Sequence, residues 1–408
     1  MLVNVTKDWK PLVLMTVVLI TGFALRIYAA TFGFNYDMES YFLIAGITDI
    51  GQNVYAQTDR YNYGPVWFQI INFFNHPPLF GLNPLIAMRY KIVVFLSLVD
   101  VAIALVLWKK FNKKVALFFF LNPISIIITG YHSQFDNLAI LLGLLAVLLY
   151  QADYKKPMLS KSAGLCLLGL SLMTKHVLFM FPIWMVLKEG KKSSFNKLLI
   201  LFIPFGIFLA GFAPYWSGSK GGIIKNVFLY GSKNNSPFWL ELAPHLLSEI
   251  FPLVVLFMGT LFVTGMLLRK KSIVESFFYY LIVVVVFSSS LANQYLSICV
   301  AALAVYPNGF FAGYSIFGAI FLIAHRSGLH QMTLQKALLP IMKLGYPLLV
   351  LFLLLGLVWH FHKEKLLDLL DRTWRWLRDE YRFQFYENNL EKTEELKVAN
   401  KTRPAQKT

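Results

Sequence analysis

Two acidic residues close together in the chain are the first candidates for chemistry. Asp37 and Glu39 come directly after the first long apolar run of the sequence. A carboxylate at the edge of a membrane could take a proton from an arriving hydroxyl group, so Asp37 is a candidate general base. The Asp-x-Glu spacing also permits ligation of one metal ion by both side chains. The alternative is that the pair marks the first turn of a helix, where negative charge is favoured.

A second group of polar residues lies between two apolar runs and includes His132, Gln134 and Asp136. Polar side chains at this density are unfavourable in a bilayer unless they line a cavity or cap helices. We therefore expect all three to contact a substrate. Asp136 could instead be the N-cap of the helix that follows.

A cationic pair, Lys175 and His176, interrupts what is otherwise one apolar stretch. Cations in such a turn are well placed to bind the phosphate of a lipid, because charge-assisted hydrogen bonds to phosphate are among the strongest available. The alternative is that Lys175 extends its ammonium group to the membrane interface without any function. Arg60 is a further candidate for the phosphate.

The elements that must position these residues are membrane helices. Of the 408 residues, 57% are hydrophobic and only 14% are charged, whereas about a quarter of the residues in soluble domains are charged. This composition excludes a soluble fold. The net charge of +17 is therefore explained by basic loops that orient the chain in the membrane rather than by nucleic-acid binding.

Apolar runs predict an all-α, polytopic fold of about twelve transmembrane helices. The expected spans are 11–30, 90–108, 115–131, 137–151, 162–175, 177–187, 197–216, 250–268, 273–291, 295–307, 309–325 and 338–360. Asp100 falls inside the second span and must find a partner, for which Arg89, Lys91 and Lys175 are the candidates.

The distribution of Lys and Arg predicts the orientation, because short basic loops stay in the cytoplasm. Most basic loop residues fall on one side, which makes the N-terminus and the C-terminal tail cytoplasmic. The other side then carries two long loops, 31–89 and 217–249. The first of these is expected to form interfacial helices at 38–50 and 65–74, which are rich in aromatic residues. The candidate active site thus lies on the non-cytoplasmic face.

The chain divides into a transmembrane domain at 1–360 and a cytoplasmic tail at 361–408. From Lys363 to Tyr386, Leu, Trp and Phe alternate with charged residues at helical spacing. This pattern predicts an amphipathic helix on the inner leaflet, followed by a disordered segment from residue 387.

Several motifs resemble the GT-C superfamily of glycosyltransferases that use polyprenyl-phosphate sugars. The first outer loop is similar to the first luminal loop of the mannosyltransferase that adds the first mannose of glycosylphosphatidylinositol, and of its prokaryotic relatives. In those enzymes Tyr-x-Asp-x-Asp-Tyr precedes Gly...Pro-Tyr and Arg-Tyr-x-Tyr-x-Pro. Here Glu39 replaces the second Asp and Val54 replaces a Pro. These differences weaken the case for a metal ion more than the case for a base.

Further matches follow in the order that the family shows. The segment Asn122-Pro123 to Asp136 resembles an Asn-Pro...Gly-x-x-x-Gln-x-Asp element, and Asn293-Gln294-Tyr295 resembles His-Pro-Gln-Tyr with its His replaced. The resemblance adds Tyr61, Tyr63, Gln294 and Tyr295 to the substrate-binding candidates.

The resemblance implies transfer of a hexose, with mannose favoured, from a polyprenyl-phosphate sugar to the hydroxyl of a lipid or glycan acceptor. Asp37 would be the base, Lys175, His176 and Arg60 would bind the donor phosphate, and Glu39 would be a support or a metal ligand. No cofactor is certain, although Mg or Mn is compatible with the motif. The membrane would be the cell membrane in a prokaryote and the endoplasmic reticulum in a eukaryote, and no nucleic-acid partner is expected.

Two other functions fit parts of the sequence. A proton-coupled secondary transporter would also have about twelve spans and intramembrane Asp, His and Lys residues. Against it, the two halves of the sequence show no convincing repeat. The third reading is a non-catalytic membrane subunit of an envelope-assembly pathway.

Overall fold

The computed structural model describes residues 10–76, 81–152, 157–189, 194–230, 235–324 and 344–401, and these residues are helical without any β-strand. They fall into two compact units, 1–354 and 355–408. The all-α architecture that the sequence predicts is confirmed for the described residues, and many of their helices are apolar.

The first half of the chain contains α1 (Lys10–Thr31), α2 (Tyr36–Asp49), α3 (Val54–Gln57), α4 (Pro65–Asn75), α5 (Pro84–Lys110), α6 (Lys113–Phe120), α7 (Pro123–Ile127), the π-helix η1 (Ile128–His132), α8 (Asp136–Gln151), α9 (Pro157–Thr174), the 3-10 turn η2 (His176–Leu178) and α10 (Phe181–Lys188). The second half contains α11 (Ser194–Ala210), α12 (Ala213–Ile223), η3 (Ile224–Phe228), η4 (Phe238–Leu242), α13 (His245–Ile250), α14 (Leu253–Leu267), α15 (Ile273–Phe287), η5 (Asn293–Ser297), α16 (Val300–Val305), α17 (Gly309–Ala324) and α19 (Gly345–Lys401).

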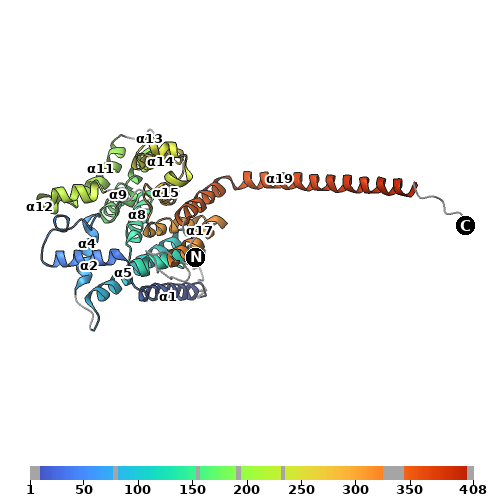
Figure 1. The fold of residues 1–408 in the computed structure, drawn as a ribbon. Helices are drawn as coiled ribbons and strands as arrows, with labels where there is room; N and C mark the ends of the chain where they lie inside the picture. The colour runs from blue at the N-terminus through green and yellow to red at the C-terminus, as the bar shows by residue number, and fades with distance from the viewer. Residues whose placement is uncertain are drawn as a thin grey trace, which may run out of the picture. The chain divides into compact units, whose positions relative to one another are not determined.

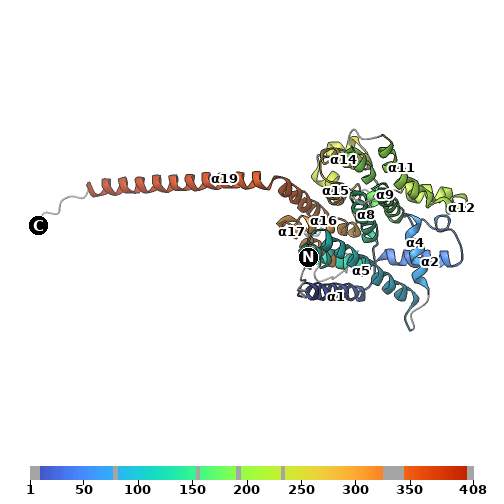
Figure 2. The same cartoon turned by 180° about the vertical axis from the view of Figure 1, so that it is seen from behind.

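Helices α8 and α9 pack against each other near the centre of the first unit (Figure 1). Seen from either side, α1 and α5 lie below this pair, and α11 and α14 lie above it (Figure 2). Helix α8 contacts both α5 and α15, and α9 contacts α11. The loop between α1 and α5 carries α2 and α4, which pack together. The expected helices at 38–50 and 65–74 are therefore present as α2 and α4.

Among the described residues, three helices are long and apolar enough to cross a bilayer by themselves, at Val13–Thr31, Pro84–Lys110 and Gly345–Arg375. Three further pairs in the same part of the chain reach that length only as bent segments, and five shorter helices are mainly apolar. One bent pair, Met158–Thr174 with His176–Lys188, turns by 117°, as expected for two short spans that meet at Lys175. The expected count of about twelve spans stays a prediction.

The span expected at 197–216 differs from the structure. Helix α11 ends at Ala210, and the chain turns by 83° into the next helical segment. Gly211 and Phe212 lie between the two helices, and Pro214 lies in the first turn of α12, where a missing N–H is harmless. The apolar run therefore did not predict this turn, because two residues can form a turn without lowering the hydrophobicity of the run. Of the last expected span, residues 338–343 lie outside the described residues.

In the second unit, α19 extends to Lys401, beyond the amphipathic segment expected to end at Tyr386. Ion pairs one turn apart, Asp368 with Arg372 and Asp371 with Arg375, support the helix. Residues 402–408 of the expected disordered segment lie outside the described residues.

A fully buried ion pair joins α1 to α5. Arg26 Nε donates to Asp100 Oδ2 at 2.9 Å, and its other nitrogens donate to the carbonyls of Gly22 and Phe120 and to Ser125 Oγ. Asp100 also accepts from Thr129 and Asn137. None of the three expected partners of Asp100 is correct, because Arg26 belongs to a different helix whose packing the sequence alone does not reveal.

We expect Asp100→Leu to destabilise the protein by about 3–5 kcal/mol, because it leaves the Arg26 charge buried without a counter-ion. Arg26→Met combined with Asp100→Leu should recover most of that loss, since no uncompensated charge remains. Thermal unfolding of the detergent-solubilised protein measures both. Equal stability of the single variant and wild type would contradict the expectation.

Candidate active site

The first turn of α2 places its two carboxylates on different sides of the helix. Successive residues of a helix are rotated by about 100°, so residues two apart do not face one another. Asp37 is half-buried, whereas the Glu39 side chain is 55% exposed and lies 4.0 Å from Arg60. The two carboxylates do not converge on one point. Both do lie in a helical first turn, as the alternative interpretation of the motif predicts.

Asp37 is held by two side-chain amides that both donate to the same carboxylate oxygen. Gln134 Nε2 lies 2.5 Å from Asp37 Oδ2, and Asn35 Nδ2 lies 3.2 Å from it. Asn35 Nδ2 is also 3.0 Å from His132 Nδ1. Burial raises the pKa of the Asp37 carboxyl above its ordinary value, and the Lys175 charge and the two amides oppose this effect. The net effect is a raised pKa of the Asp37 carboxyl, with burial as its main cause.

Segment 132–136 links this carboxylate to the rest of the site. It leaves π-helix η1 through Ser133, whose φ of 54° and ψ of 40° are left-handed, and then enters α8 at Asp136. Among the described residues, Ser133 is the only non-glycine residue with positive φ. Such strain concentrates at functional sites. The sharp turn directs Gln134 to Asp37 and Asp136 to Lys175.

Lys175 and Asp136 form a second buried ion pair. Lys175 Nζ donates to Asp136 Oδ2 at 2.7 Å, and both side chains are at least 96% buried. The ammonium group also lies over the rings of three aromatic residues, at 4.9 Å from Phe135, 5.1 Å from Tyr63 and 5.7 Å from Tyr295. Asp136 Oδ1 is buried without a hydrogen-bond partner.

Two alternatives from the sequence are thereby wrong. Asp136 is the first residue of α8 and makes no N-cap hydrogen bond, so it is not an N-cap. Lys175 does not extend to the membrane interface, because its ammonium group points inward to Asp136.

A cavity of about 340 Å³ opens beside Lys175, within the usual range of small-molecule pockets. Its polar lining includes Lys175, His176, Tyr63, Tyr295 and the serine run 288–290. Its apolar lining comes from α11, η3, α14 and α15 through Phe208, Val227, Phe228, Phe257, Met258, Leu261, Val284 and Val285. Phe228 and Tyr230 are 40% and 48% exposed at its wall. The cavity therefore suits a molecule with both a polar and an apolar part.

The cavity gives His176 a role that depends on its unpaired nitrogen. His176 Nδ1 is buried and has no hydrogen-bond partner, and the ring lines the cavity beside Lys175. A buried nitrogen without a partner is unfavourable unless a ligand satisfies it. Lys175 and His176 thus lie next to each other in the lining of the cavity.

The structure does not bring all the expected site residues together. Tyr61 is buried against Phe68 and donates to the Gly64 carbonyl at 2.6 Å, so it supports the loop. Arg60 stacks on Tyr36 and donates to Ser40 on the outer side of α2. Neither Arg60 nor Gln294 lines the cavity. Tyr63, Lys175, His176 and Tyr295 line it, and Asp37, His132, Gln134 and Asp136 form the adjoining hydrogen-bonded cluster.

Sequence reasoning missed the serines at 288–290 and the amide of Asn35. The serines follow directly on α15 and line the cavity. Three consecutive hydroxyl residues at the end of an apolar run were a usable signal, since such residues are unfavourable in a bilayer without partners. Asn35 gave no such signal, because a single amide two residues before an acidic residue is common, and its contact with His132 lies 97 residues away in the sequence.

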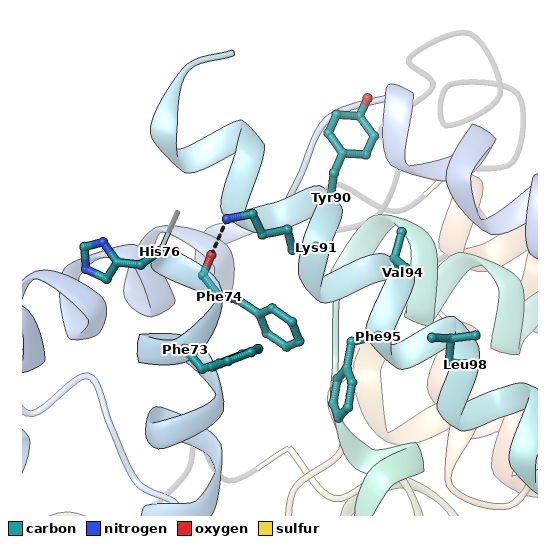
Figure 3. A pocket seen from close by; sticks show the side chains of 8 residues that line it. All are labelled: Phe73, Phe74, His76, Tyr90, Lys91, Val94, Phe95 and Leu98. Atoms are coloured by element: carbon teal, nitrogen blue, oxygen red, sulfur yellow. Dashed lines mark hydrogen bonds between the residues drawn. The ribbon is translucent and has the colours of Figure 1, made fainter. Parts of the chain in front are cut away.

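A larger cavity of about 440 Å³ lies apart from this cluster, between α4 and α5. Phe73 and Phe74 face Val94, Phe95 and Leu98 across it, and Lys91 donates to the Phe74 carbonyl (Figure 3). It contains none of the expected site residues. Among the residues that the structure describes, no group of three His, Cys, Asp or Glu side chains could hold a metal ion. Asp37 and Glu39 lie on different sides of α2, so these two side chains do not form a shared divalent-cation site.

Comparison with known proteins gives a similarity in structure only. No protein-family model matches the chain, and no curated protein matches it. Two crystal structures of ArnT from Cupriavidus metallidurans are similar, one in the apo state and one bound to undecaprenyl phosphate. Each is 14% identical and covers 84% of this chain and 75% of its own, with TM-scores of 0.48 and 0.49.

Proposed function

We propose that this protein is an integral-membrane glycosyltransferase. It transfers a hexose, with mannose favoured, from a polyprenyl-phosphate sugar to a hydroxyl group of a lipid-linked or other acceptor. The reaction takes place on the non-cytoplasmic face, which the distribution of basic loops supports. The protein also contacts the lipid bilayer, from which the lipid-linked sugar donor enters the site.

One observation carries the proposal: a carboxylate with a raised pKa adjoins a cation-bearing cavity of mixed polarity. Asp37 and Lys175 are close enough for the Lys175 charge to lower the Asp37 pKa, and Lys175 lines the cavity. The apolar lining fits the first part of a prenyl chain, and the Lys175–His176 pair fits its phosphate. These are the requirements for transfer from a lipid phosphate to a hydroxyl group.

The chemistry follows from this arrangement. Asp37 accepts the proton of the acceptor hydroxyl as its oxygen attacks the anomeric carbon of the donor sugar. The bond from that carbon to the phosphate oxygen breaks, and its electron pair stays on the phosphate. Lys175 and His176, already in place before the reaction, stabilise the negative charge that develops there. Inversion at the anomeric carbon is what the resemblance in sequence implies.

Transfer itself is the experiment that tests the proposal. Purified protein is incubated with lipid extracts and with labelled polyprenyl-phosphate mannose or polyprenyl-phosphate glucose, with and without EDTA. We expect labelled product from the mannose donor. Absence of transfer from both donors would contradict the proposal and favour a transporter.

We expect Glu39→Gln to change the transfer rate by no more than about twofold, because exposed side chains away from the reacting groups contribute little. The rate should also be unaffected by EDTA. Initial rates with the labelled donor measure both effects. If Glu39 held an essential metal ion, its removal and EDTA would each abolish transfer.

A further inference from the structure

The hydrogen bonds around Asp37 assign a function to Gln134 that differs from substrate binding. We propose that Gln134 is the positioning residue of the base: it holds Asp37 Oδ2, so that Oδ1 is the oxygen that receives the acceptor proton. This inference rests on the proposed function, because it presumes that Asp37 is the base. The proposed role of Gln134 is to orient the Asp37 carboxylate and not to contact the sugar.

The first step is that both amide donors use the same oxygen. Gln134 and Asn35 each bond to Asp37 Oδ2, and no donor among the described residues bonds to Oδ1. A carboxylate bound in this way cannot rotate without losing both hydrogen bonds. The remaining oxygen therefore keeps one direction and an unused acceptor site.

The second step is that Gln134 is itself fixed at both ends. Its Oε1 accepts from the Tyr41 hydroxyl at 3.4 Å, and its side chain is 1% exposed. The acceptor role of Oε1 directs Nε2 to Asp37, so the amide is oriented as a donor. Tyr41 in turn packs against Trp67 and Phe135. A residue packed so closely has little room to contact a sugar.

The third step is the strained backbone at Ser133. Its left-handed conformation places Gln134 and Asp136 so that the first reaches the base and the second reaches Lys175. A non-glycine residue in this region is maintained only where the surrounding structure requires it. Segment 132–136 thus fixes the position of Asp37 relative to Lys175, through Gln134 and Asp136.

The charged and titratable groups around Asp37 must be considered in any test by pH. Lys175 is the nearby cation and Asp136 the nearby anion, and Gln134 and Asn35 donate to the carboxylate. The hydroxyls of Tyr41 and Tyr63 belong to the same cluster, and His132 lies beyond Asn35. Of these, Gln134 makes the shortest hydrogen bond to Asp37, at 2.5 Å.

Gln134→Leu provides the test, because it removes the donor at nearly constant volume. A donor that binds the ionised carboxylate favours ionisation, so its loss raises the pKa of Asp37. We expect the acid limb of the kcat profile to move to higher pH. At pH values above this limb kcat should stay reduced by about tenfold, the effect of one hydrogen bond to a charged group, because the ionised carboxylate is no longer held in one orientation. The KM for the donor should not change. Gln134→Glu, which places a second carboxylate at this position, should shift the acid limb further in the same direction.

Gln69→Leu is the matched control. Gln69 also donates its amide to a side-chain oxygen, that of Tyr215 at 2.8 Å, but it is exposed and belongs to α4. It should leave the pH profile as in wild type. A raised KM in Gln134→Leu with an unmoved acid limb would overturn the proposal and return Gln134 to substrate binding.

A second readout does not depend on sugar transfer. Infrared difference spectra of the substrate-free protein, with Asp37→Asn as the reference, follow the protonated carboxyl band of Asp37 during a pH titration. We expect this band to titrate at higher pH in Gln134→Leu than in wild type and to be unmoved in Gln69→Leu. If the band moves but wild type transfers no sugar, the proposed function fails, and Gln134 holds a carboxylate that is not the base of a sugar transfer. If sugar is transferred but the band does not move, the positioning role fails alone.

Discussion

Asp37→Asn is expected to lower the transfer rate by about 10²- to 10⁴-fold, the usual contribution of a general base. The asparagine keeps the shape of the side chain but cannot accept the acceptor proton. Initial rates with the labelled lipid-phosphate sugar measure the effect. Retention of most of the activity would remove Asp37 from the role of base.

The same variant should remain folded, which distinguishes a catalytic loss from a structural one. Because burial raises the pKa of Asp37, the folded protein holds this proton more tightly than the unfolded chain does. Stability linked to Asp37 is then present at low pH and is lost as the pH rises through the raised pKa. At neutral pH the asparagine removes this unfavourable charge, so its Tm should equal or exceed that of wild type. Glu39→Gln, the same chemical change two residues along, is the matched control.

Lys175→Met is expected to destabilise the protein by about 3–5 kcal/mol, because it leaves the Asp136 carboxylate buried without its cation. Both side chains of the pair are almost completely inaccessible to solvent, so water cannot compensate the charge. Thermal unfolding in detergent measures the loss. The variant should also fail to transfer sugar, but that result alone does not separate folding from function.

The double variant Lys175→Met with Asp136→Asn distinguishes a loss of stability from a loss of transfer activity. It buries no unpaired charge, so we expect its Tm to return towards that of wild type. Its transfer rate should stay reduced by about 10²- to 10³-fold, the usual effect of removing one group that stabilises developing negative charge. A double variant that transfers sugar at the wild-type rate would show that Lys175 does not bind the phosphate.

Much of the fold could be predicted from the sequence because membrane helices leave a strong local signal. Runs of apolar residues must satisfy their backbone hydrogen bonds internally, so each long run becomes a helix. This holds for α5, α8 and α17 and for the interfacial candidates α2 and α4. It fails at Gly211–Pro214, where a turn of a few residues interrupts a run without lowering its hydrophobicity.

The positions of single site residues were also partly predictable. Asp37, Lys175 and Asp136 were identified because charged and polar residues are rare in apolar surroundings and are retained there only with partners. Which partners they have was not predictable. Asp100 pairs with Arg26, and Lys175 pairs with Asp136, across 74 and 39 residues of sequence respectively.

Asp37 and Glu39 illustrate both what the sequence determined and what only the tertiary structure decided. By itself, the sequence determined that Asp37 and Glu39 follow the first span, and it favoured Asp37 as the base. Only the tertiary structure shows that the two side chains lie on different faces of α2, with Asp37 half-buried and Glu39 55% exposed. The amide of Gln134 that holds Asp37 comes from the turn at Ser133, 97 residues later, whereas the amide of Asn35 is local. Such contacts depend on the packing of α1, α5 and α8, which no local pattern of residues encodes.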